Sequence, residues 1–296
     1  MKLSRPLALW CLLPLALFGG GWWLRSRPLR QQYGNLNSRV KAQEVTTLFF
    51  PDGPFLVPVS RRLGRGASAR LVLDNLLAGP SKQSGLLNPF HSHLEIRALE
   101  IRDGIAQLDL TTNLAGDLAE PARRALVATL TGLPDITSVA IRVNGQSSGA
   151  NIPSIPMRRT PLAYYASPNG LVAVASAASS PRQMITGYLQ GPPSTTLTGL
   201  PSDVQLIAYK YDAVARAVWL NLTYRPSLRT LALEQPDRMR FVLLGIIASL
   251  TEFPEVATVE LNFEGKTRLG VGQCSDLLRT PQRRPELLND ERLLSR

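Results

Sequence analysis

The feature that most constrains this chain of 296 residues is a segment that occurs twice. Residues 130–145 (LTGLPDITSVAIRVNG) and 250–265 (LTEFPEVATVELNFEG) align without a gap, with Leu, Thr, Pro, Val and Gly at identical positions. Each copy is typical of a helix end, a proline stop, and an alternating strand closed by glycine. Such a copy indicates that the surrounding chain contains a duplicated folding unit.

The match extends backwards from each copy through further segments in the same order. In one pair, Ser68 and Ser180 can each cap the start of a helix, and a Gly-Pro pair ends it. The matched segments are 68–80 with 180–192, Asp52-Gly53 and 56–59 with Asn169-Gly170 and 171–174, and 107–110 with 219–222. We therefore expect the same fold in both units.

Each unit predicts the order strand, turn, strand, helix, strand, turn, strand, helix, strand. This order indicates the α+β class, with two tandem, α/β-sandwich-like repeats that each hold a mixed sheet and two helices. A unit of about 100 residues is the usual size for one hydrophobic core. The predicted division is a membrane anchor and tether (1–44), repeat 1 (45–145), a linker (146–160), repeat 2 (161–267) and a charged C-terminal tail (268–296).

The repeat residues resemble a known family. The segments Leu56-Val57-Pro58-Val59, LLAGPS at 76–81, Asp109-Leu110 and LTGLP…V…VNG within 130–145 are similar to the GerMN (sporulation and spore germination) domain. The resemblance covers both repeats and is sharper in the first. It implies an anchored, extracytoplasmic protein that is not an enzyme and resembles the ring-building modules of envelope complexes. The motif residues are mostly structural, so the resemblance implies no catalytic, cofactor-binding or metal-binding residues.

The N-terminal region predicts a membrane segment. Residues 6–24 contain no charged side chain, and about 20 apolar residues span a bilayer as a helix. A Trp22-Trp23 pair suits an interfacial anchor, and no Ala-x-Ala cleavage site is present. We therefore expect a single N-terminal anchor in the cell membrane with extracytoplasmic domains; the alternative is a cleaved signal peptide and a secreted protein. The flanking charges do not decide the orientation.

The net charge of +11 is concentrated away from the repeats. Residues 1–40 hold six Lys and Arg and no acidic residue, whereas 161–267 carry no net charge. Anionic lipid head groups are the natural counterpart of the basic N-terminal region. A nucleic-acid module would concentrate basic residues on its folded domain, so nucleic acid is not an expected partner.

Residues that could carry chemistry are few. His91 and His93 share one face of an extended segment, but no Cys or third His completes a zinc site with them. The two cysteines, Cys11 and Cys274, lie in the predicted anchor and near the tail and do not indicate a compartment. No Walker motif and no complete Gly-x-Gly-x-x-Gly motif is present, and Asp109 is matched by Asn221 in the second repeat. We expect Asp109 to bond a loop or cap a strand end.

Two segments carry separate hypotheses. The helix predicted at 240–250 is apolar around most of its circumference, with Leu243 and Leu244 where repeat 1 has Arg123 and Arg124. A helix of this kind is usually buried on both sides, so we expect it to pack against repeat 1; the alternative is a helix that is buried only inside its own repeat. The tail is expected to be mobile or to form a short amphipathic helix over 286–294.

Two functions remain open. The first is a non-enzymatic assembly or binding module that contacts protein subunits of a membrane or envelope complex, of the sporulation or germination type. It predicts apolar surface or open sheet edges. The second is a module that binds or processes peptidoglycan, which predicts a groove lined by aromatic rings and carboxylates.

Overall fold

The computed structural model describes residues 43–64, 67–90, 94–113, 118–147, 157–266 and 274–294. The predicted membrane segment, most of the tether, and the His91–His93 cluster lie outside these ranges. Within them, no helix is both long and apolar enough to cross a bilayer. The segment Glu44–Arg296 forms one compact unit that contains both repeats.

Repeat 1 contains the predicted order of elements, with a short 3-10 turn and a two-residue strand added. Its first helix begins where Ser68 accepts a hydrogen bond from the Leu71 amide (3.2 Å), and Gly79 after it has φ +83°. Both features are those predicted from the Ser and Gly-Pro positions. The elements are β1 (Gln43–Asp52), β2 (Phe55–Gly64), α3 (Ala69–Leu77), η1 (Lys82–Ser84), β3 (Glu95–Arg102), β4 (Ile105–Thr111), α4 (Glu120–Leu130), β5 (Ser138–Val143) and β6 (Gln146–Ser147).

Repeat 2 follows the same order but has three helices, where two were predicted. The additional helix, α6, buries only Leu228 and Ala232, a pattern too short to be read from the sequence. The elements are β7 (Leu162–Ser167), β8 (Gly170–Ala175), α5 (Pro181–Leu189), β9 (Leu206–Asp212), β10 (Ala217–Leu222), α6 (Pro226–Glu234), α7 (Pro236–Leu250) and β11 (Thr258–Phe263). The α+β class and the tandem repeat are thus confirmed.

Each repeat has a mixed outer sheet. In the order β3-β4-β5-β6, β4 is antiparallel to β3 and parallel to β5; in the order β11-β10-β9, β10 has the same relations to β9 and β11. The polar residue in the middle strand bonds the turn after the last strand in both. Asp109 Oδ1 accepts from the Gly145 amide (3.3 Å) and Asn221 Oδ1 from the Gly265 amide (2.8 Å). The expected structural role of Asp109 is therefore confirmed.

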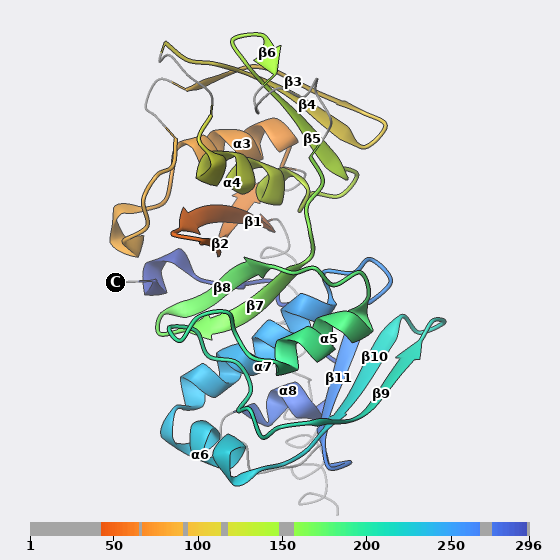
Figure 1. Cartoon of the computed structure of the whole chain (residues 1–296). Helices are drawn as coiled ribbons and strands as arrows, with labels where there is room; N and C mark the ends of the chain where they lie inside the picture. Colours follow the sequence, from red (N-terminus) through yellow and green to blue (C-terminus); the bar gives the residue numbers. More distant parts are fainter. Residues whose placement is uncertain are drawn as a thin grey trace, which may run out of the picture. The chain divides into compact units, whose positions relative to one another are not determined.

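The first two strands of each repeat form a different sheet from the one predicted. The hairpins β1–β2 and β7–β8 join into one four-stranded sheet, β1-β2-β8-β7, in which Leu56 of β2 lies opposite Ala173 of β8. Figure 1 shows the two hairpins adjacent to each other, between the helices of repeat 1 and those of repeat 2. The sheet therefore crosses the boundary between the repeats.

The hairpins can join because they are apolar on both faces, a pattern typical of strands that are covered on both sides. One face of each hairpin, including Phe50 and Tyr165, belongs to the main core. The other face forms a separate buried cluster between the repeats. This inter-repeat cluster consists of Phe49, Leu56, Ala128, Leu162, Tyr164, Leu171, Ala173, Ala248 and Leu288.

The long helix of each repeat contacts the outer strand of its hairpin through a small polar side chain. The amide of Phe49 in β1 donates to Thr129 Oγ1 of α4 (3.0 Å), and the amide of Tyr164 in β7 donates to Ser249 Oγ of α7 (2.8 Å). The hypothesis that α7 packs against repeat 1 was therefore only partly correct. Helix α7 packs mainly on β7, α5 and α6 of its own repeat. Its residue Ala248 belongs to the inter-repeat cluster.

The tail differs most from the expectation, because its described part is neither detached from the repeats nor a single helix. It contains α8 (Asp276–Arg279) and the 3-10 turn η3 (Glu291–Leu293), and Asn289 is only 3% exposed. The Asn289 side chain donates to the carbonyls of Pro58 (2.7 Å) and Leu171 (2.8 Å) and accepts from the Leu171 amide (2.7 Å). One side chain thus links β2 of repeat 1 to β8 of repeat 2.

Candidate binding site between the repeats

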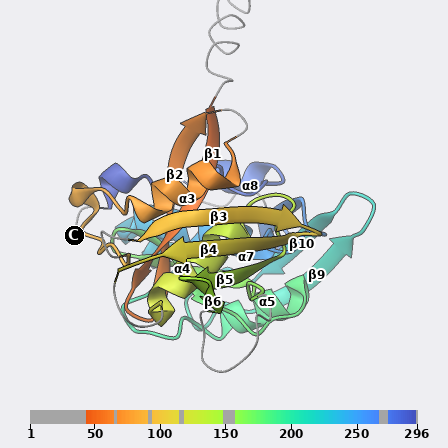
Figure 2. The ribbon, with the colours of Figure 1, turned by 90° about the horizontal axis from the view of Figure 1, so that it is seen from above.

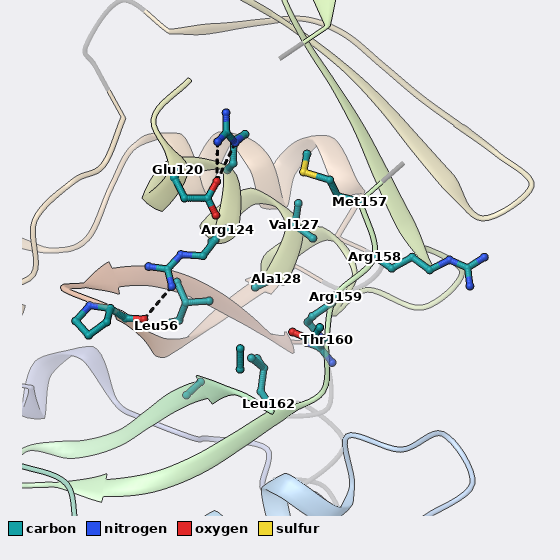
Figure 3. Close-up of a pocket in the computed structure, with 14 residues that line it drawn as sticks. Leu56, Glu120, Arg124, Val127, Ala128, Met157, Arg158, Arg159, Thr160 and Leu162 are labelled. Atoms are coloured by element: carbon teal, nitrogen blue, oxygen red, sulfur yellow. Dashed lines mark hydrogen bonds and ion pairs between the residues drawn. The ribbon is translucent and has the colours of Figure 1, made fainter. Parts of the chain in front are cut away.

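A cavity of about 230 Å³ lies where α4, the β1–β2 turn, the segment before β7, and β8 meet. Its floor is apolar and its rim is cationic. Figure 3 shows Arg124 and Glu120 on α4, Leu56 and Leu162 below them, and Arg158 pointing away from the group. The lining residues are Pro54, Leu56, Glu120, Arg123, Arg124, Val127, Ala128, Met157, Arg158, Arg159, Thr160, Leu162, Ala173 and Ala175.

Arg124, at the rim of the cavity, makes no ion pair with an acidic side chain among the described residues. Its guanidinium donates to the carbonyls of Pro54 (2.8 Å) and Gly53 (3.3 Å), which hold the side chain over the β1–β2 turn. Its Nε is buried and has no hydrogen-bond partner. The N–H groups that do not donate to Pro54 or Gly53 and are not buried are the second ones on the two terminal nitrogens.

The other ordered cations at the rim are paired. Arg123 is bonded to Glu120 one helical turn earlier (2.7 Å). Arg159 is paired with Glu252 of repeat 2 (2.7 Å), whose side chain is fully buried. The remaining arginine, Arg158, is exposed and directed away. Positive charge that is free to meet a ligand is therefore concentrated at Arg124.

Beside the cavity, a buried polar cluster joins repeat 2, the end of the linker, and the tail. Glu252 accepts from the Tyr164 hydroxyl (2.9 Å) and pairs with Arg284 of the tail (2.7 Å) as well as with Arg159. Arg284 also donates to the Tyr164 hydroxyl (3.0 Å) and to the Ala248 carbonyl (3.1 Å). Burial, and after it the Glu252 carboxylate, raises the pKa of Tyr164 well above its usual range. Tyr164 therefore stays neutral, and its hydroxyl donates a hydrogen bond to Glu252.

The lining of the cavity consists of apolar side chains and arginines, with few groups that could take part in a reaction. The lining contains no Ser, Cys or His that could act as a nucleophile or base, and its one carboxylate, Glu120, is occupied by Arg123. Nowhere in the described ranges do three or more His, Cys, Asp or Glu side chains group as a metal site would require.

A second surface feature is the edge of the outer sheet of repeat 2. Strand β9 ends its sheet, and its exposed apolar residues are Ile207 (51% exposed) and Tyr211 (37%), followed by Val214 (97%) at the hairpin tip. The β9–β10 hairpin extends beyond the neighbouring elements in both views (Figures 1 and 2). The equivalent edge strand of repeat 1, β3 (EIRALEIR), carries four charges of alternating sign beside the exposed Ile101 (45%), whereas β9 (LIAYKYD) carries only Lys210 and Asp212. Charged side chains protect an edge from pairing.

Sequence reasoning assigned no site residues and did not identify the cavity. The apolar spacing predicts a helix that starts at Pro121 and has Arg123 and Arg124 on its outer face. It does not connect these two residues with Arg158 and Arg159. The available signal was the substitution of Arg124 by Leu244 between the repeats. That difference indicates that the two positions have different surroundings, but it does not identify the residues that lie opposite Arg124.

The fold and this junction define a protein of two tandem, pseudo-symmetric α+β domains that share a central sheet and a buried interface. The chain belongs to the Germane family, described as sporulation and spore germination, whose sequence model matches residues 47–149 and 162–269. The predicted membership of the GerMN group is thereby confirmed.

Two relatives show the extent of the similarity. The spore germination protein GerM of Bacillus subtilis (strain 168) is 32% identical over 110 residues, which are 34% of this chain and 30% of that protein. The solved structure of the tandem GerMN domains of the sporulation protein GerM from Bacillus subtilis matches with a TM-score of 0.61 at 18% identity. That match covers 84% of this chain and 99% of the solved one, and it supports the tandem fold.

Proposed function

We propose that this chain is a membrane-anchored, extracytoplasmic module that assembles with protein subunits of a cell-envelope complex of the sporulation or germination type and catalyses no reaction. The similarity to GerM supports the process, and the uncharged segment 6–24 supports the anchor. The observation that carries the proposal is the β9 edge. It leaves backbone hydrogen-bonding groups open to a partner strand next to exposed apolar side chains, which is how proteins add a strand from a partner.

The contrast between the repeats supports a protein partner. An open edge with exposed apolar residues risks aggregation unless a partner covers it, and β3 shows that this fold can protect the same edge with charges. The alternative, peptidoglycan binding or processing, needs aromatic rings for sugars and carboxylates for acid–base chemistry. The cavity lining contains no aromatic residue, so it does not favour that alternative.

The test is site-specific photocrosslinking in native membranes from Val214, the most exposed apolar side chain of the described chain. We expect adducts with envelope proteins, and we expect Ile207→Lys to remove them. Leu233→Lys on α6 is the matched control, because Leu233 is also exposed (60%) but lies away from β9. Absence of protein adducts, combined with retention of the full chain on purified wall sacculi at moderate salt, would favour the peptidoglycan alternative instead.

The anchor has a separate test. The full chain is expected to stay with the membrane fraction after an alkaline carbonate wash. Recovery from the medium of a protein that lacks the first 24 residues would show signal cleavage and a secreted protein.

A further inference from the structure

From the cavity between the repeats we infer a binding site for the C-terminal carboxylate of a polypeptide that ends in a small aliphatic residue. The inference deepens the proposed function by adding a second contact to a protein partner, and it rests on that function only in taking the partner to be a protein. The contact is remote in sequence from β9 and uses different chemistry.

The charge of the site selects an anion. Arg124 lacks an acidic partner among the described residues, while Arg123 and Arg159 are paired with Glu120 and Glu252. Of its five N–H groups, two donate to backbone carbonyls and the one on Nε is buried, which leaves one N–H on each of the two terminal nitrogens. A guanidinium with N–H groups free matches the two oxygens of a carboxylate.

The size of the cavity and its apolar floor indicate which kind of residue carries the carboxylate. A volume of about 230 Å³ is below the roughly 300–1,000 Å³ of sites for drug-sized molecules, so it admits about one residue. The floor is made by Leu56, Val127 and Leu162, which offer dispersion contacts to an aliphatic side chain. Without an aromatic ring in the lining, a sugar has no stacking surface here. A terminal Ala, Val or Leu satisfies both the charge and the floor.

The position of Arg124 also separates a binding role from a folding role. The equivalent residue in repeat 2 is Leu244, which is partly buried and packs against the inter-repeat cluster. A Leu side chain is therefore compatible with this place in the fold, and Arg124→Leu is expected to leave the protein folded while it removes the charge.

The test measures peptide binding to the full-length chain in detergent by isothermal titration calorimetry. The probes are acetyl-Ala-Ala-Leu with a free carboxylate, the same peptide with a C-terminal amide, and acetyl-Lys-D-Ala-D-Ala, which represents a cell-wall stem peptide. We expect the free acid to bind at least tenfold more tightly than the amide. Arg124→Leu is expected to abolish that difference, and Arg229→Leu, which removes an exposed charge on α6, to preserve it.

Equal binding of the acid and the amide, or no binding of either, would overturn the inference. Unchanged binding by a folded Arg124→Leu variant, checked by circular dichroism, would also overturn it. Tighter binding of the D-Ala peptide than of acetyl-Ala-Ala-Leu would replace the polypeptide by the cell wall as the source of the carboxylate. Crosslinking from Val214 can still succeed when these experiments fail, so the two proposals are refuted separately.

Discussion

Among the described glycines, Gly245 in the middle of α7 has the closest neighbouring atom for an added Cβ. A Cβ added to this glycine would come well inside contact distance of the Tyr164 carbonyl oxygen in β7 and within 3.2 Å of the Tyr188 hydroxyl. Both neighbours are fully buried, and the closest atom is backbone that cannot rotate away. We therefore expect Gly245→Ala to push α7 and β7 apart.

The magnitude follows from two opposing effects. Overpacking a buried contact costs about 1–3 kcal/mol, and the displaced strand would also weaken the bond from the Tyr164 amide to Ser249 Oγ, worth about 1 kcal/mol. Replacing glycine by alanine inside a helix gains roughly 1 kcal/mol. The net expectation is a loss of about 2 kcal/mol in the free energy of unfolding. Repeat 1 has Ala125 at the equivalent place, fully buried, so α4 leaves room for a methyl group where α7 does not.

The assay is urea unfolding of the full-length chain in detergent, followed by far-ultraviolet circular dichroism. Gly187→Ala is the matched control, because Gly187 lies inside α5 and a Cβ there meets no atom within 4 Å. That variant is expected to be more stable by roughly 0.5–1 kcal/mol, since only helix propensity changes. If Gly245→Ala is as stable as the original protein, or shifts in the same direction as Gly187→Ala, the packing argument is wrong.

Two further predictions concern the buried groups of repeat 2. Glu252→Ala leaves two arginines without their shared carboxylate and is expected to lower the free energy of unfolding by about 3–5 kcal/mol in urea titration, whereas Glu234→Ala on the surface should change it little. Burial also raises the pKa values of the three tyrosines of repeat 2 that are less than 5% exposed, that of Tyr165 to about 12. A tyrosine whose pKa is higher in the folded than in the unfolded state contributes stability below the unfolded value of about 10, and this contribution is lost as the pH rises further. The urea concentration at the unfolding midpoint should therefore decrease as the pH is raised from 10 to 12. Absorbance at 295 nm checks this, and ionisation of all tyrosines near pH 10 in the folded protein would contradict it. The tyrosines concerned are Tyr164, Tyr165 and Tyr188.

The candidate site illustrates how far sequence reasoning reaches. The helix that carries Arg123 and Arg124 was predicted with its start at Pro121, and the structure begins α4 at Glu120. The sequence pattern did not predict that residues 157–160 lie near this helix and line a cavity together with it. A binding site made by segments that are distant in sequence has no local signature.

The sequence by itself determined the elements and their duplication. Capping serines, glycines with positive φ and alternating strands act within a few residues, so the same local pattern produces the same element in both repeats. The role of Asp109 followed from the same reasoning, because its counterpart Asn221 keeps the one property that matters, an oxygen that accepts from the following turn.

Only the tertiary structure decided which surfaces meet. Hairpins with two apolar faces can be covered in several ways, and it is the pairing of β2 with β8 that unites the repeats in one unit. The sequence of the tail likewise indicates only a charged, proline-containing end. In the structure, the Asn289 side chain makes hydrogen bonds to three backbone groups where β2 and β8 meet. Those partners come from strands more than 100 residues earlier, so the bonds exist only after the repeats have come together.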